Sequence, residues 1–152
     1  MRLEEGQDAP AFSAKDQTGE TRTSDEFADG KLVIYFYPKA FTPGCTQESC
    51  DFRDRHDLFT DQGYAILGVS PDAPEKLQKF KDEHNLPFDL LSDPDNEIAT
   101  AFGAYGEKKN YGRTYQGIIR STFLIDSGTI ESAHYNVKAT GHAERIAKAV
   151  LS

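Results

Sequence analysis

The chain has 152 residues, of which 38% are hydrophobic and 28% are charged, and this composition is typical of an ordinary globular protein that buries a core without disulfides. Its 17 basic and 25 acidic residues give a formal net charge of −8, which argues against nucleic-acid binding because phosphate contacts require clustered Lys and Arg. No apolar run is long enough to span a bilayer, and residues 1–5 do not resemble a secretory signal. We expect one cytoplasmic domain spanning residues 1–152, with no membrane partner.

The first third of the chain has the pattern of a β-hairpin followed by a buried strand. Residues 11–14 and 21–23 flank a turn-forming segment at 17–20, and Ser24 is a good N-cap for a short helical turn. The run Lys31–Tyr37 is continuous, β-branched and aromatic. Such a run predicts a central strand that is buried on both faces.

A loop at 38–44 then leads into a predicted helix from about Cys45 to Asp61. One helical stripe supports this helix, because buriable or small residues recur at the spacing of a single face, at Cys45, Ser49, Phe52, His56 and Phe59. Open α/β sheets place their chemistry beyond the carboxyl ends of strands, which is where this loop lies. On this stripe we interpret His56 as a partly buried histidine and not as a catalytic base.

The remaining segments alternate between strand and helix patterns. We expect strands at 64–69, 88–91, 117–125 and 130–135, helices at 73–84, 93–102 and 143–151, and a loop at 103–117. We interpret the basic residues of this loop, Lys108, Lys109 and Arg113, as solvated. The order predicts an α/β fold with a mixed central sheet, helices on both faces and an N-terminal β-hairpin.

The two cysteines, Cys45 and Cys50, are the residues most suggestive of chemistry. Cys45 follows Pro43-Gly44 at the start of the predicted helix, where unpaired backbone N–H groups and the positive end of the peptide dipoles favour a thiolate. Because the thiolate is the reactive form, this placement predicts redox chemistry. The four histidines are scattered, without the paired spacing of a zinc site, and we expect neither a metal nor a cofactor.

Arg120 is unusual because it lies within an apolar run, between Ile119 and Phe123. A buried arginine requires a carboxylate or a bound anion as its partner. The alternative is an outward-facing arginine that pairs with one of the many surface acids. The run alone leaves both interpretations open.

Together these residues resemble a known family. The spacing Pro38-x3-Thr42-x2-Cys45 resembles the active-site signature of the peroxiredoxins, and Cys50 at the fifth position beyond resembles the bacterioferritin-comigratory (PrxQ) subfamily. Further matches cover the chain in order, at residues 35–39, 91–95, 105–108 and 120–126. One departure is Tyr105, where relatives often carry Trp.

The resemblance implies a thioredoxin-like fold and the reduction of hydrogen peroxide or organic hydroperoxides. It implies that Cys45 is the peroxidatic cysteine, which forms a sulfenic acid, and that Cys50 is the resolving cysteine of an atypical two-cysteine enzyme. Thioredoxin or a similar dithiol is the implied reductant, and a monomer is the expected state. The supporting shell carried over by position consists of Pro38, Thr42 and Arg120, with weaker supporting roles for Gly44 and Glu48.

Helix geometry makes the expected disulfide conditional on a structural change. Five residues along an α-helix give a rise of about 7.5 Å and a rotation of about 140°, which separates the two Cα atoms by roughly 8–9 Å. A disulfide requires Cα atoms closer than about 7 Å. The start of the helix must therefore unwind before Cys50 reaches Cys45.

Three other interpretations remain at this point. A thiol–disulfide oxidoreductase is weakened because Cys-x4-Cys is not the Cys-x-x-Cys of thioredoxin-like exchangers. A non-enzymatic redox sensor or holdase shares Cys45 and the unwinding helix but does not require Arg120. A small binding domain with incidental cysteines leaves the Pro-Thr-Cys spacing unexplained.

Overall fold

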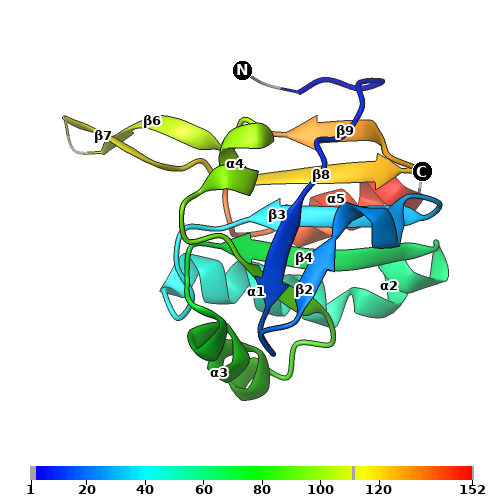
Figure 1. The fold of residues 1–152 in the computed structure, drawn as a ribbon, viewed down its shortest axis with the longest axis horizontal. Helices are drawn as coiled ribbons and strands as arrows, with labels where there is room; N and C mark the ends of the chain where they lie inside the picture. Colours follow the sequence, from blue (N-terminus) through cyan, green and yellow to red (C-terminus); the bar gives the residue numbers. More distant parts are fainter. Residues whose placement is uncertain (1–2, 111, 152) are drawn as a thin grey trace.

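The apolar run that follows the first hairpin forms β3 (Lys31–Phe36), the centre of a seven-stranded sheet. The computed structural model of the chain describes residues 3–110 and 112–151. The sheet has the order β2-β1-β5-β4-β3-β8-β9, in which β3 is parallel to β4 and antiparallel to β8 (Figure 1). The other strands are β1 (Ser13–Asp16), β2 (Thr21–Thr23), β4 (Tyr64–Ser70), β5 (Asp89–Ser92), β8 (Ser121–Asp126) and β9 (Thr129–His134).

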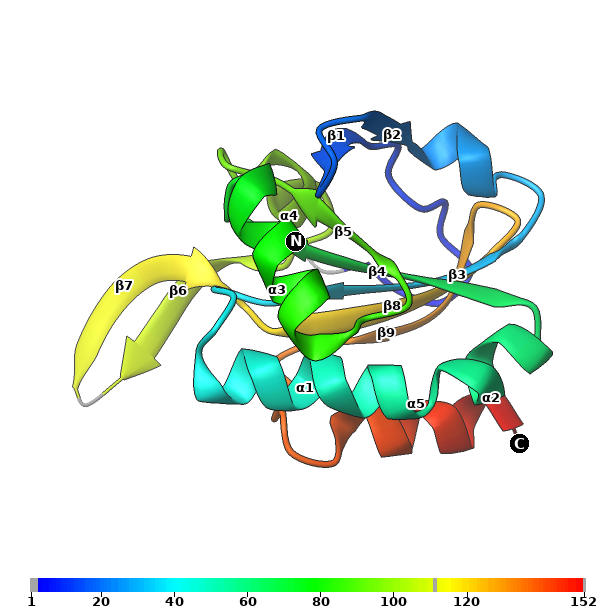
Figure 2. The same ribbon diagram turned by 90° about the horizontal axis from the view of Figure 1, so that it is seen from below.

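Helices cover both faces of this mixed sheet, as predicted. Val33, Tyr35 and Tyr37 pack in one cluster with α1 (Pro43–Asp54), α2 (His56–Asp61), α3 (Pro74–His84) and α5 (His142–Leu151). The alternate residues of β3 face the other cluster, which includes α4 (Glu97–Ala101). Figure 2 shows α1, α2 and α5 on one side of the sheet and α4 on the other. In the part of the chain described, no helix is long and apolar enough to cross a membrane.

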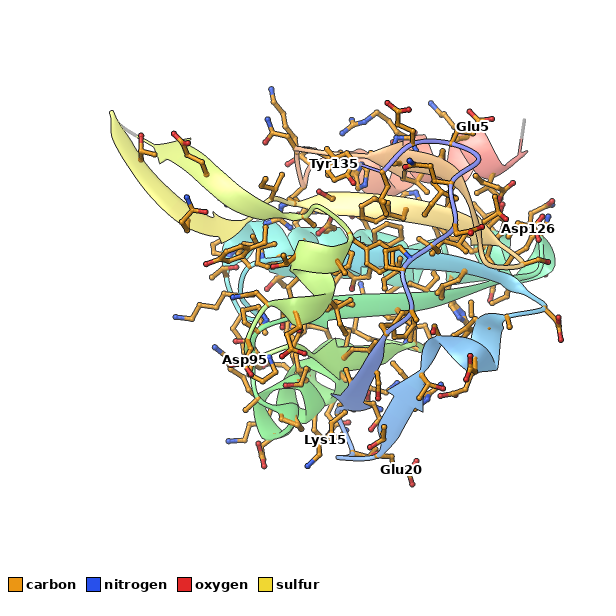
Figure 3. The ribbon with its side chains drawn as sticks, turned by 45° about the horizontal axis from the view of Figure 1, so that its top comes forward. Glu5, Lys15, Glu20, Asp95, Asp126 and Tyr135 are labelled. Carbon is orange, nitrogen blue, oxygen red and sulfur yellow. The ribbon has the colours of Figure 1, made fainter. Side chains whose placement is uncertain are left out.

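The N-terminal arm is tied to the second cluster through Tyr135, which is labelled in Figure 3 beneath that arm. Its hydroxyl accepts a hydrogen bond from the Leu3 N–H at 2.7 Å and donates one to the Phe102 carbonyl oxygen at 2.5 Å. The labelled charged side chains Lys15 and Glu20 lie at the outer end of the β1–β2 hairpin.

Residues 103–117 do not form the expected loop. They contain most of a two-stranded antiparallel hairpin, β6 (Tyr105–Asn110) and β7 (Arg113–Ile118), that extends away from the main sheet (Figure 1). This segment is rich in Gly, Lys and Tyr and lacks the alternation of apolar and polar residues that indicates a strand. The alternation is absent because the hairpin projects from the core and does not bury one face. Lys108 is half-buried, whereas the side chains of Lys109 and Arg113 lie outside the described part of the structure.

The expected single strand at 117–125 is also wrong, because it is interrupted at Ile119 and Arg120. The Ile119 N–H donates to the Ala104 carbonyl at 2.7 Å, and the Arg120 carbonyl accepts from Val137 N–H at 3.0 Å. The backbone polar groups that leave the sheet here are thus satisfied by neighbouring segments. The break lies at the residue whose side chain enters the candidate site.

Three helix boundaries differ as well. The helix predicted for 93–102 is α4, which runs only from Glu97 to Ala101. The helix predicted for 45–61 starts at Pro43 and is divided at Arg55, where φ is −111° and ψ is 11°. The short helical turn (Ser24–Phe27) is capped by Thr23 and not by Ser24. The Ser24 hydroxyl instead accepts a hydrogen bond from the Phe12 N–H at 3.1 Å.

Gly68 on β4 leaves room for the side chains that fix the central strands. It pairs with Tyr35 on β3 and with Leu90 on β5. A Cβ atom at this position would lie 2.8 Å from the Tyr35 ring and 2.9 Å from a Leu90 methyl group. Both neighbours are fully buried, so neither has free space to move into.

We therefore expect Gly68→Ala to lower the free energy of unfolding by about 1–3 kcal/mol through overpacking. Urea denaturation under reducing conditions measures this loss. Gly30→Ala is the matched control, because a Cβ there meets no atom within 4 Å. Equal stabilities for the two variants would contradict the packing described here.

Candidate active site

The helix start that carries Cys45 is built by the loop after β3. Thr42 is the N-cap residue, with φ −84° and ψ 151°, and Pro43 occupies the first helical position, where its fixed φ suits the helix and no N–H is needed. Cys45 therefore lies in the first turn, among backbone N–H groups without helical partners. Its side chain is fully buried.

Arg120 reaches Cys45 from the break between β7 and β8. Its Nη2 donates a hydrogen bond to the Cys45 sulfur at 3.2 Å, and its Nη1 donates to Glu48 Oε1 at 2.6 Å. The arginine side chain is 16% exposed and the Glu48 side chain 0%. Arg120 therefore faces inward, and one guanidinium holds a sulfur and a carboxylate on the same helix face.

Gly44 makes room for this approach. A Cβ at this position would lie 3.4 Å from Arg120 Nη2, which is the close limit of ordinary van der Waals contact. Pro38, two residues beyond the end of β3, is half-buried at the start of the same loop. The structure thus brings Gly44, Cys45, Glu48 and Arg120 together and places Pro38 at the entrance of the loop.

Glu48 has an unusual electrostatic environment. Its Oε1 pairs with Arg120, whereas Oε2 is buried without a hydrogen-bond partner among the described residues. Burial raises the pKa of Glu48 to about 7, against the opposing effect of the Arg120 charge. For Arg120, burial works to lower the pKa, but Glu48 and the Cys45 sulfur outweigh it and leave the pKa raised.

Thr42 is oriented by the loop itself. Its hydroxyl donates to the Lys39 carbonyl oxygen at 2.7 Å. The hydroxyl proton is therefore engaged, and Thr42 presents oxygen lone pairs, not a donor, toward an incoming molecule. In the same loop, the Ala40 N–H donates to Asp72 Oδ2 at 2.7 Å. Sequence reasoning missed Asp72, although its place after the carboxyl end of β4 was a usable signal.

Cys50 is on the same helix as Cys45, and both are free thiols. The buried face of α1 comprises Cys45, Glu48, Ser49 and Phe52, whereas Cys50 is only partly buried. Burial raises the pKa of Cys50, Arg53 opposes the shift, and the nearby acids Asp51 and Asp54 add to it. In the folded helix Cys50 is thus held as a thiol, the less reactive form.

Two other residues, Lys108 and His56, have different relations to the site. Lys108 on β6 was interpreted as solvated, but burial lowers its pKa and its charge interacts with Arg120 and Cys45. It therefore lies at the rim of the site. His56 is half-buried on α2, with its Nδ1 4.0 Å from the Asp57 carboxylate, in agreement with a structural histidine.

Known proteins are similar to this chain in sequence and in fold. The sequence profile of the AhpC/TSA family matches residues 6–133. A putative peroxiredoxin of Mycobacterium tuberculosis is 52% identical over 146 residues, which cover 95% of this chain and 93% of the relative. The peroxiredoxin Bcp of Bacillus subtilis is 48% identical over 143 residues, covering 93% of this chain and 91% of the relative.

A structure of a PrxQ mutant from Xylella fastidiosa aligns with a TM-score of 0.91 at 30% identity, covering 99% of this chain and 97% of that one. A structure of the bacterioferritin comigratory protein of Xanthomonas campestris aligns with a TM-score of 0.86 at 38% identity, covering 92% and 90%. The fold is therefore the thioredoxin-like fold of peroxiredoxins. The chain belongs to the AhpC/TSA family and is a peroxiredoxin similar to the Bcp and PrxQ proteins.

The buried carboxyl group of Glu48 is expected to make stability depend on pH. Its folded-state pKa of about 7 is above the ordinary value of 4.5. At a pH between these two pKa values, the Glu48 carboxyl group is therefore protonated in a smaller fraction of unfolded chains than of folded chains. The free energy of unfolding therefore falls as the pH rises through this window, by ~3 kcal/mol in total. Glu48→Gln lacks this titration.

Urea denaturation of the two reduced proteins from about pH 5 to about pH 8 measures the difference. We expect the wild type to lose stability relative to Glu48→Gln over this range. Groups common to both proteins cancel in the comparison, so a constant difference would contradict the raised pKa.

Proposed function

We propose that the enzyme reduces hydrogen peroxide and organic hydroperoxides through Cys45. The observation that carries the proposal is the 3.2 Å contact between Arg120 Nη2 and the Cys45 sulfur, because a fixed cation at the reacting sulfur stabilises the negative charge that develops on the leaving oxygen. Alkyl peroxide reduction is the activity ascribed to the similar bacterioferritin comigratory protein of Xanthomonas campestris, which supports the same substrate class here.

In the first step the Cys45 thiolate attacks one oxygen of the hydroperoxide. The S–O bond forms as the O–O bond breaks, so sulfur is oxidised to sulfenic acid and the second oxygen leaves as hydroxide or alkoxide and takes up a proton. Charge moves from sulfur to the leaving oxygen. Arg120, already fixed by Glu48, stabilises that charge without reorganising, and Pro38 shields the sulfur from water.

In the second step Cys50 attacks the sulfenic sulfur, and water leaves as the Cys45–Cys50 disulfide forms. The intact helix forbids this bond, so the first turns of α1 must unwind. Their buried residues are held by polar contacts: Cys45 and Glu48 to Arg120, and Ser49 to Tyr35 at 2.9 Å. Unwinding also removes the burial that raises the pKa of Cys50, so the same motion frees this thiol and makes it more reactive.

Further along α1, Phe52 anchors the helix during this motion. Its ring stacks on Tyr35 with centroids 4.7 Å apart and contacts Phe59 at 5.8 Å. A thioredoxin or a similar dithiol then reduces the disulfide by exchange and restores both thiols. We propose that residues 1–152 carry out this atypical two-cysteine cycle as one cytoplasmic domain and as a monomer.

Cysteine variants test the two chemical roles. We expect Cys45→Ser to abolish peroxide consumption. Cys50→Ser should consume one equivalent of peroxide and then stop when thioredoxin is the reductant. Mass spectrometry after one equivalent should show a loss of two hydrogens and an intrachain Cys45–Cys50 crosslink in the wild type. Repeated turnover by Cys50→Ser at the wild-type rate would exclude the intramolecular disulfide.

Arg120→Lys tests the bidentate guanidinium while keeping the positive charge. An ammonium is a point charge and does not reproduce both contacts. We expect the rate constant for Cys45 oxidation to fall roughly a hundredfold, the usual cost of a lost transition-state donor. Rapid-quench measurement of sulfenic acid gives this rate constant, and Arg53→Lys on the outer part of α1 is the matched control. An unchanged rate would favour a non-enzymatic sensor.

A further inference from the structure

We propose that Asp72 is a positioning residue for the peroxidase reaction and acts through the Lys39–Ala40 peptide on Thr42. This inference rests on the proposed function. Asp72 is on the connection between β4 and α3 and touches none of the reacting atoms. It is neither part of the Pro-Thr-Cys signature nor among the residues that the sequence indicated.

One peptide group links the two side chains. Ala40 N–H donates to Asp72 Oδ2 at 2.7 Å, and the carbonyl of the same peptide group, that of Lys39, accepts the Thr42 hydroxyl at 2.7 Å. A carboxylate on the N–H side makes the carbonyl oxygen a stronger acceptor, because hydrogen bonds in a chain polarise one another. Asp72 thus fixes the direction in which the Thr42 hydroxyl points its proton and its lone pairs.

Asp72 is itself held in a defined position. Its carboxylate is only 8% exposed and pairs through Oδ1 with Lys76 at 3.2 Å. Its Oδ2 also accepts from the Ser70 hydroxyl at 2.9 Å, and its carbonyl accepts from the Ser92 hydroxyl at 2.7 Å. The acceptor for Ala40 is therefore anchored to the carboxyl ends of two neighbouring strands.

The loop needs such an anchor because its backbone is strained. Phe41 lies between Ala40 and Thr42 with a φ of 66°, a left-handed conformation that bulky residues rarely adopt. The residue is 41% exposed, and its ring makes an edge contact with Phe80 on α3, with centroids 5.2 Å apart. Strained residues of this kind persist only where surrounding contacts hold them. The Asp72 hydrogen bond is such a contact on the buried side of the loop.

The orientation matters because the Thr42 oxygen is expected to accept a hydrogen bond from the hydroperoxide O–H. The Thr42 hydroxyl donates its own proton to the hydrogen bond with the Lys39 carbonyl, so its oxygen accepts the hydrogen bond from the substrate O–H. This hydrogen bond aligns the O–O bond with the Cys45 sulfur. Without Asp72 the Lys39–Ala40 peptide group is held less firmly. The Thr42 hydroxyl then spends time in orientations in which it points its proton, and not its lone pairs, at the substrate.

The test measures the rate constant for Cys45 oxidation by rapid quench with hydrogen peroxide. We expect Asp72→Ala to lower it roughly tenfold, the effect of one net hydrogen bond on a rate. Asp72→Asn, whose side-chain oxygen still accepts from Ala40, should retain most of the rate. Lys76→Ala is the matched control, because it removes the ion pair and leaves the acceptor in place. If the Asp72→Ala protein does not fold, Asp72→Ser is measured in its place.

A double-mutant cycle with Thr42→Val separates positioning from a general loss of structure. If Asp72 acts through the Thr42 hydroxyl, its substitution has no further effect on the oxidation rate once that hydroxyl is absent. Additive losses, or equal rates for Asp72→Ala and the wild type, would overturn the inference. Those outcomes leave the proposed function intact, whereas a wild-type protein in which peroxide does not oxidise Cys45 would overturn the proposed function itself.

Discussion

The site depends on one shared guanidinium. Arg120 joins the Cys45 sulfur to the Glu48 carboxylate, and these two groups lie one helical turn apart on the buried face of α1. A buried carboxylate and a buried sulfur are each costly without a partner. Because both use the same cation, the first turn of the helix stays packed on the sheet only while Arg120 is in place. Reactivity at Cys45 and folding of the helix start therefore have a common origin.

Helix α1 is held differently along its length. Its first half buries Cys45, Glu48 and Ser49, whose hydrogen bonds go to Arg120 and Tyr35. Cys45 also packs in the apolar cluster, but buried ion pairs contribute little net stability. Its second half buries Phe52, which stacks on Tyr35 of the central strand. The segment that must move for a disulfide is thus the segment with the weaker attachment. The division at Arg55 lets α2 form its own contact between Phe59 and Phe52.

The sequence predicted the central strands, the mixed sheet and the cysteine at a helix start, because continuous apolar runs and Pro-Gly punctuation are local signals. It did not predict the β6–β7 hairpin, whose strands bury little, or the break at Arg120, which depends on the partners of Ile119 and on Val137. Arg120 was recognised as unusual, but its inward direction required the fold. Asp72 has a place after the carboxyl end of β4 as its one sequence signal, but its role depends on a contact with a backbone N–H 32 residues away, which only the fold reveals.

The order in which the chain is synthesised gives the Cys45–Arg120 contact a further consequence. The two residues are 75 positions apart, and β8, which follows Arg120 directly, pairs with β3 beside the Cys45 loop. A nascent chain emerges from its N-terminus, so Cys45 leaves the ribosome well before Arg120 does. During that interval the cysteine lacks its guanidinium partner. The contact between Cys45 and Arg120 is therefore assembled only once β8 has joined β3 in the sheet.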